Sequence, residues 1–134
     1  MKNLTIPGLL ILVVACIATS ASAHHSAAGI DRTKTVTVEG TVKEFKWANP
    51  HSWLDVEVPN SKGGKDLWSF EMNPPAYLVR TGWKASSVKV GDKVKVVGRP
   101  FMNGDPGGIF VSVTLPSGQT LAAGAAPSNV NEQK

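Results

Sequence analysis

Short segments in which apolar and polar residues alternate follow one another along most of the chain. In the first, Lys34–Trp47, the valines up to Val42 share one face, and the apolar positions then shift phase at Phe45. Alternation with a period of two is typical of a half-buried strand. A shift of phase within one strand indicates a bulge, and Gly40 in the same segment favours a bend around a barrel.

Four further segments show the same alternation, and one short segment does not. The predicted strands are His51–Val58, Lys65–Met72, Lys93–Gly98 and Ile109–Leu115. Between the second and third of these, Asn73-Pro74-Pro75 predicts the start of a short helix that ends near Arg80, with Asn73 as its cap and Pro in the first turn. The loop Asn103–Gly108 is predicted to be a hairpin turn.

The order of these elements predicts an all-β fold with one short helix. Three strands, a helix and two strands, with a long bent first strand, match the five-stranded OB barrel. A small open sandwich is the alternative. Trp83, directly after the helix, is expected to fill one end of the core, and Met72 is expected to face inward.

Residues 1–23 have the pattern of a cleavable signal peptide. Lys2 precedes an apolar run, Leu4–Ala18, that is shorter than the ~20 residues a membrane-spanning helix needs. Ala21-Ser22-Ala23 has the small-x-small form that signal peptidase recognises. We therefore expect export to the periplasm with no membrane span. The segment Val13–Cys16 also fits the pattern around a lipidated cysteine, so a lipid anchor at Cys16 is the alternative that we favour less.

Removal of residues 1–23 leaves 111 of the 134 residues, a natural size for one domain. We expect an OB-like domain over residues 24–118 and a disordered tail over residues 119–134, which are rich in Ala, Gly, Ser and Asn. The signal segment contains one charge, Lys2, so the net charge falls from +4 to +3. This small excess is spread along the chain, and we expect no nucleic-acid partner. Without Cys16, no disulfide or thiolate metal site is available.

The three histidines are the candidate metal ligands. Cleavage after Ala23 places a free amino group on His24, followed at once by His25, and a terminal amine with an imidazole chelates a borderline metal such as Cu(II). His51 follows Asn49-Pro50 at a predicted turn. We hypothesise that His24, His25 and His51 bind copper or another divalent ion. The alternative is that the terminus is frayed and that His51 only caps its turn.

The predicted strand from His51 to Val58 also indicates a possible contact surface. Its outward positions are His51, Trp53, Asp55 and Glu57, and an exposed Trp often marks a contact with another protein. A secreted protein-interaction module that uses Trp53 and Asp55, without metal, is therefore the alternative function. No pair of groups is placed for acid–base chemistry, so we expect no enzymatic activity.

Several motifs together resemble an uncharacterised family of small secreted bacterial proteins, known only as a domain of unknown function. They are His24-His25-Ser26, Trp47-Ala48-Asn49-Pro50-His51, Gly82-Trp83, Gly91-Asp92 and the closing Val113-Thr114-Leu115-Pro116. The resemblance covers about residues 24–116. It implies an exported single domain with an OB-like barrel, places the three histidines on motif positions, and supplies no activity.

Overall fold

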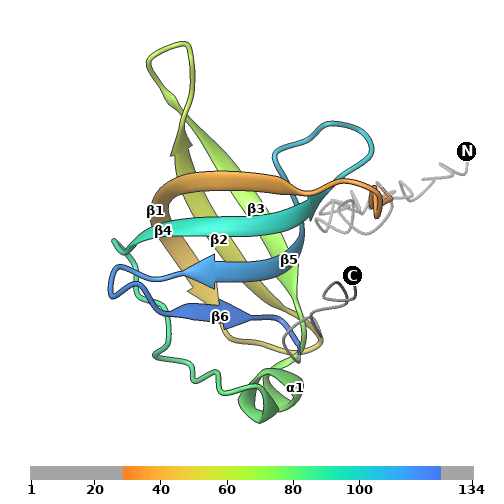
Figure 1. Ribbon diagram of the computed structural model, residues 1–134, viewed down its shortest axis with the longest axis vertical. Coiled ribbons are helices and arrows are strands. Elements are labelled where there is room, and N and C mark those ends of the chain that lie inside the picture. The colour runs from red at the N-terminus through yellow and green to blue at the C-terminus, as the bar shows by residue number, and fades with distance from the viewer. Residues whose placement is uncertain (1–28, 125–134) are drawn as a thin grey trace, which may run out of the picture.

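Six strands and one short helix make up residues 29–124, the part of the chain that the computed structural model describes (Figure 1). The elements are β1 (Val36–Lys46), β2 (Ser52–Pro59), β3 (Lys65–Met72), α1 (Pro75–Arg80), β4 (Lys93–Pro100), β5 (Gly107–Thr114) and β6 (Thr120–Ala122). All five predicted strands and the predicted helix are present. In this part of the chain, α1 is the only helix, and no helix has the length and apolar character needed to cross a membrane.

The first five strands close into a barrel. β1 pairs with both β2 and β4, and the antiparallel ladder continues from β2 to β3 and from β4 to β5. A short parallel pairing, Ser69–Glu71 with Gly107–Ile109, joins β3 to β5 and closes the circle. This mixed five-stranded barrel, with a helix between β3 and β4, has the predicted OB topology, and the open sandwich is excluded.

The long first strand bends so that it can belong to both sides of the barrel. Its register against β2 shifts between Val42 and Glu44, which confirms the predicted bulge. At Gly40 the crossing with β2 is so close that a Cβ atom would lie 2.3 Å from the carbonyl oxygen of Glu57. A side chain at this position would therefore push β1 and β2 apart.

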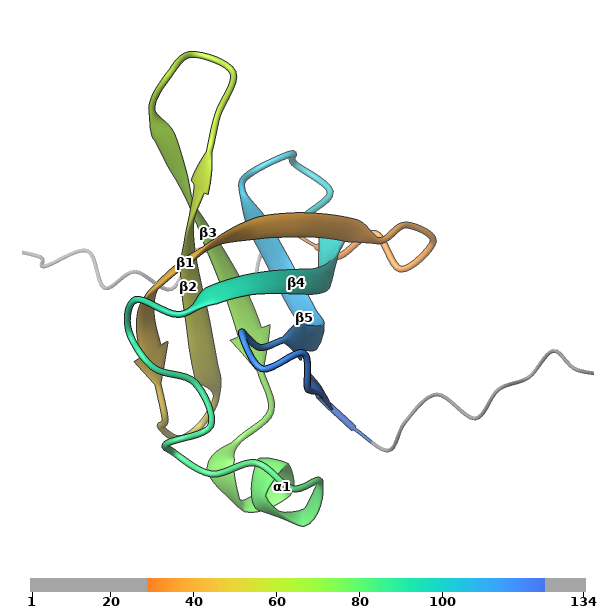
Figure 2. The same ribbon diagram turned by 60° about the vertical axis from the view of Figure 1, so that its left-hand side comes forward.

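The barrel interior holds the inward residues of all five strands, including Met72, which is 3% exposed as predicted. Trp83 follows α1, which lies at one end of the barrel (Figure 2). Its side chain is 1% exposed and packs edge-on against Phe110, with ring centroids 5.5 Å apart. The indole Nε1 donates a hydrogen bond to the carbonyl oxygen of Ala122 (2.7 Å). Trp83 is thus part of the core, as predicted, and it also ties α1 to the chain after β5.

The structure differs from the prediction at two places. Asn73 does not cap α1: the N-cap is Pro74, without a side-chain cap bond, and the Asn73 amide donates to the carbonyl oxygen of Ala123 (3.0 Å). The ordered domain also continues past residue 118, because Thr120–Ala122 forms β6 against β5 and Leu121 packs on the core. The expected disordered tail is therefore wrong for residues 119–124, and residues 125–134 lie outside the described part.

Candidate functional site

His51 and Glu71 form a contacting pair on the outer surface of the barrel. His51 ends the β1–β2 loop, two residues after Asn49, and the Asn49–Pro50 peptide bond is cis. Its Nδ1 contacts Oε1 of Glu71 on β3, and the two side chains are 50% and 14% exposed. An ionised carboxylate oxygen only accepts hydrogen bonds, so in this pair Nδ1 carries the proton. In the neutral imidazole, Nε2 then has the free lone pair.

The β2–β3 hairpin brings Glu71 to this position. At its turn, the side-chain oxygen of Asn60 accepts hydrogen bonds from the backbone N–H groups of Lys62 (3.1 Å) and Gly64 (2.9 Å). The turn sets the register, and regular pairing from there places Glu71 opposite Trp53. Glu71 therefore points to the same outer face as the side chains next to His51.

Sequence reasoning did not identify Glu71. The available signal was the hairpin itself: the predicted strands His51–Val58 and Lys65–Met72 flank a short loop. Counting outward from that loop pairs position 53 with position 71. The alternation of faces then places the Glu71 carboxylate beside the outward residues of β2.

The carboxylates of the other outward residues of β2 do not join the pair. Asp55 lies opposite Ser69, and its carboxylate has no hydrogen bond or ion pair within the described residues. Glu57 is bound to Lys43 and Lys65 near the far end of the strand. Six residues separate it from His51, about 20 Å along a strand. Trp53 is partly buried and makes contacts of its own.

Two of the three predicted metal ligands, His24 and His25, lie outside the described residues. Within residues 29–124 there is no group of three or more His, Cys, Asp or Glu side chains that could hold a metal ion. Of the predicted metal ligands, only His51 is in the described structure, with the carboxylate of Glu71 beside it.

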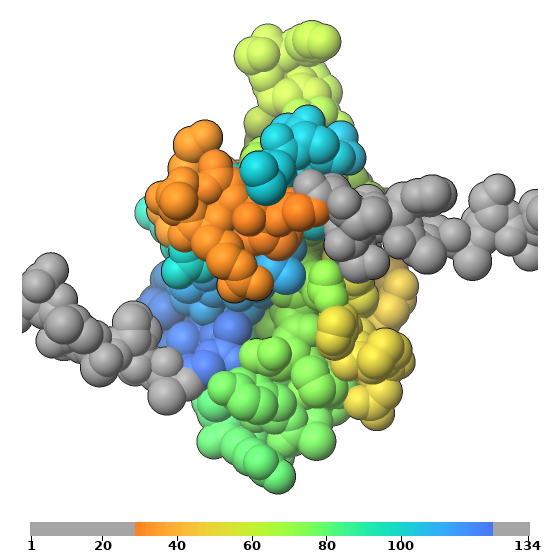
Figure 3. Space-filling model, turned by 90° about the vertical axis from the view of Figure 1, so that its right-hand side faces the viewer, coloured from red at the N-terminus to blue at the C-terminus, as the bar shows by residue number. Residues whose placement is uncertain are grey.

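The beginning of the described chain lies on the same face as the β1–β2 loop. Figure 3 shows the segment after Gly29 (orange), the β4–β5 loop (cyan) and the β1–β2 loop (gold) together on that face. The carbonyl oxygen of Gly29 accepts a hydrogen bond from Met102 (3.1 Å), and Ile30 forms a bridge with Phe101. The described chain therefore begins beside the β4–β5 loop.

The comparison with known families agrees with the resemblance seen in the motifs. A family model described as "Family of unknown function (DUF6152)" matches residues 12–111, which is 100 of the 134 residues. No curated protein and no solved structure matches the chain. Because the match spans well over half of its length and most of the barrel, the chain belongs to this family of unknown function, DUF6152.

Proposed function

We propose that the protein is a periplasmic, non-catalytic binding module that holds a divalent metal ion, with Cu(II) favoured, between His51 and the histidines at the start of the exported chain. The proposal depends on cleavage after Ala23, which places the free amino group on His24. A lipid anchor at Cys16 would leave His24 inside the chain and remove that ligand.

The observation that carries the proposal is the contact between His51 and Glu71. Histidines that bind metals generally donate the second ring N–H to a carboxylate or a carbonyl, which orients the ring and raises the basicity of the ligating nitrogen. Nδ1 of His51 meets Oε1 of Glu71 in this way. The half-exposed ring leaves Nε2 as the nitrogen available to an ion.

The length of the chain before Gly29 supports a shared site. Gly29 pairs with Met102, the neighbouring Phe101 pairs with Gly107 of β5, and Gly107 pairs with Ser69 of β3. Glu71 lies two residues beyond Ser69 along β3. Gly29 and Glu71 are therefore separated by three strand spacings and three residues along a strand, about 17 Å. The five residues from His24 to Gly29 span about 17 Å when extended. A fully extended segment can therefore bring His24 to Glu71, whose side chain contacts His51.

The ligand set suits copper. The His24 amine and imidazole, the imidazole of His51 and that of His25 are nitrogen donors, for which Cu(II) has the highest affinity among the divalent ions of the first transition series. The amino group of a chain terminus, with a pKa of about 8, loses its proton readily to a metal. Glu71 is assigned to positioning His51 and not to binding the ion.

We expect the correctly processed protein to bind about one equivalent of Cu(II), measured by calorimetry and by quenching of tryptophan fluorescence. His51→Ala should lower the affinity by removing a ligand. Glu71→Gln should lower it by about 10- to 100-fold, the range found when the carboxylate behind a metal-binding histidine is lost. Glu44→Gln is the matched control, because Glu44 is exposed on β1 and pairs with no cation in the described structure.

A chain with one extra residue before His24 tests the terminal amine separately from the rings. It should bind Cu(II) more weakly than the processed protein, since the amine then no longer belongs to a histidine. Absence of Cu(II) uptake by the processed protein, or an unchanged affinity in His51→Ala, would refute the metal site. Those results would favour the alternative module, which binds a periplasmic protein partner through Trp53 and Asp55.

A further inference from the structure

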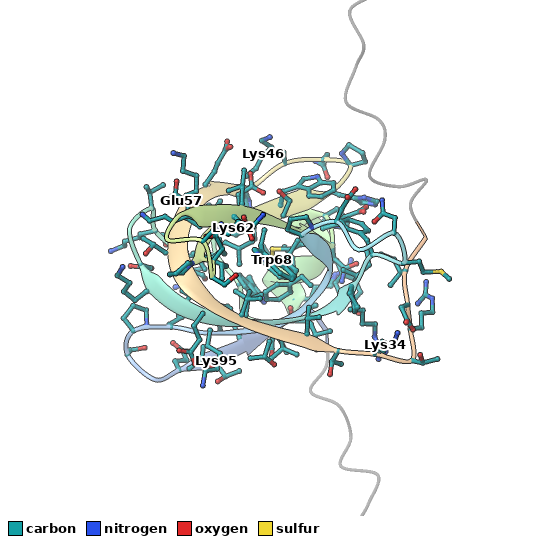
Figure 4. All side chains as sticks on the ribbon, turned by 90° about the horizontal axis from the view of Figure 1, so that it is seen from above. Lys34, Lys46, Glu57, Lys62, Trp68 and Lys95 are labelled. Atoms are coloured by element: carbon teal, nitrogen blue, oxygen red, sulfur yellow. The ribbon has the colours of Figure 1, made fainter. Side chains whose placement is uncertain are left out.

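A second surface feature lies where β1 bends, at the other end of β2 from His51. The strands line an open hollow of about 470 Å³, within the usual size range of small-molecule sites. Its charged lining residues are Glu39, Glu57, Lys65, Lys93 and Lys95. Figure 4 shows Glu57 and Lys95 on the same side of the barrel, while Trp68 lies within the ring of strands.

Cross-strand pairing assembles these residues on the outer face. Thr41 on β1 lies between Glu57 of β2 and Lys93 of β4. In the next row, Lys95 of β4 lies between Glu39 of β1 and Thr114 of β5. Because opposite residues of neighbouring strands share a face, both rows point into the same hollow.

Both carboxylates in the hollow are already neutralised. Glu57 lies 3.4 Å from Nζ of Lys43 and 3.4 Å from Nζ of Lys65, and hydrogen bonds from these lysines lower the pKa of its carboxyl group. Glu39 lies 2.8 Å from Nζ of Lys95, and its hydrogen bond raises the pKa of that ammonium group. Neither carboxylate contacts Lys93.

Lys93 therefore remains without a carboxylate partner within the described residues. Its Nζ donates to the hydroxyl oxygen of Thr41 (2.7 Å), which holds the ammonium group in place but carries no charge. Together with Lys43, four lysines surround two carboxylates, so the hollow carries a net charge of +2. An anion can be accepted there without displacing either glutamate.

The hollow also contains apolar surface beside the lysines. Pro59 at the end of β2 and Leu115 after β5 line it; Pro59 is exposed, and Leu115 is partly buried because it also packs against the core. We infer that this hollow is a binding site for a small organic anion, whose carboxylate or phosphate group lies against Lys93 and whose apolar part lies against Pro59 and Leu115. The site is separate from the proposed metal site and does not depend on where the signal segment is cleaved.

Phenyl phosphate is a suitable probe because it combines a ring with an anionic group. Added to the ¹⁵N-labelled exported protein, it should shift the amide resonances of Thr41, Lys93 and Thr114 in a saturable way. Lys93→Gln should weaken binding by about three- to fivefold, as expected for an exposed charged contact. Benzyl alcohol, which has the ring but no charge, should bind much more weakly at the same amides.

Lys84→Gln is the matched control for charge, because Lys84 is exposed, lies outside the hollow and loses the same charge. It should leave the affinity unchanged, and the rest of the spectrum reports whether each variant keeps its fold. Equal weakening by Lys84→Gln would mean that phenyl phosphate responds only to overall charge, and equal binding of benzyl alcohol would mean that Lys93 plays no part. Either result, or the absence of shifts at these amides up to the solubility limit of the probe, would overturn the inference.

Discussion

The local electrostatics of single side chains in this barrel depend on neighbours that short turns and cross-strand pairs supply. Asp31 is the clearest case. Its carboxylate accepts hydrogen bonds from the Thr33 hydroxyl (2.6 Å) and backbone N–H (3.0 Å), and it lies 3.1 Å from Nζ of Lys34. These contacts, the Thr33 hydroxyl first, lower the pKa of Asp31 to about 2. The turn that leads into β1 is therefore stabilised by the ionised form.

Removal of the Thr33 hydroxyl should raise the pKa of Asp31. A carboxyl group whose pKa is lowered by folding stabilises the fold above its unfolded pKa of about 3.9. This stabilisation is lost as the pH falls through the folded value of about 2. Thr33→Val should move the folded pKa of Asp31 toward its ordinary value, so that less stability is lost as the pH falls between these limits. NMR titration of the Asp31 carboxyl carbon measures this pKa. Thr35→Val, also exposed, should leave that titration unchanged.

The two charged clusters on the barrel surface also differ in the side chains they contain. The His51–Glu71 pair holds an imidazole with one free nitrogen, whereas Glu57 and Glu39 are saturated by lysines. Nitrogen ligands and a supporting carboxylate suit a metal ion, and an excess of ammonium groups suits an anion. One end of β2 therefore suits a metal cation, and the other end suits an anion.

Among the elements, β1 is the one whose shape governs the barrel. It pairs with β2 through one part and with β4 through the other, and both pairings meet near Gly40 and Thr41. The bulge after Val42 increases the local twist, and Gly40 allows the close approach to the β2 backbone. The bend also brings the rows of the anion-binding hollow together.

Gly40→Ala should destabilise the protein strongly. The added methyl group would lie 2.3 Å from the carbonyl oxygen of Glu57, which belongs to the backbone and cannot rotate away. Overpacking of this kind costs about 1–3 kcal/mol, seen as a lower midpoint in urea unfolding. Gly64→Ala is the control: its nearest contacts are 3.6 Å away, in the flexible Asn60 side chain. A Gly40→Ala midpoint as high as that of Gly64→Ala would contradict this account of the bend.

The glycine-rich segment after β4 does more than connect two strands by a turn. Gly107 belongs to β5, and a Cβ atom there would lie 2.2 Å from the carbonyl oxygen of Ser69. Its φ of 133° is also in the region that favours glycine. The glycine therefore allows β5 to meet β3 where the barrel closes, which a pattern of turn residues does not reveal.

At the scale of the whole molecule, the chain after β5 completes the end of the barrel near α1. β6 adds to β5 outside the closed circle, and Leu121 packs on the core. The carbonyl oxygens of Ala122 and Ala123 accept hydrogen bonds from Trp83 and Asn73, respectively. The helix, the barrel and the C-terminal strand are thereby joined by hydrogen bonds between residues that are far apart in sequence.

A chain that ends at Ser117 should lose stability relative to one that ends at Gly124. The truncation removes the acceptor of the Trp83 N–H, and a buried donor without a partner costs about 1–3 kcal/mol. A loss near 2 kcal/mol lowers the Tm by roughly 8–16 °C for a domain of this size, measured by circular dichroism. The chain that ends at Gly124 keeps every contact described here, so its Tm should equal that of the full chain. Equal Tm values for the two truncated chains would show that β6 does not support the barrel.

Much of the fold could be predicted from local pattern. Alternation located the five barrel strands, and the phase shift before Phe45 located the bulge. Chain ends and caps were predicted less well. Asn73 has the composition of a cap, but the acceptor at Ala123, fifty positions away, takes its amide instead. β6 was missed because its three residues carry little periodic signal and are held by β5 and the core.

By itself, the sequence determined the succession of strands along the chain, their inward and outward faces and the position of His51. These follow from the period of two along each strand and from the residues that end strands. Only the tertiary structure decided which outward residues meet. Glu71 reaches His51, and Lys93 has no carboxylate partner among the described residues, because of register and barrel closure, which are set by pairings between distant segments. A one-residue change of register would turn each of these side chains to the other face, so chemistry on the barrel surface depends on the pairing as much as on the composition.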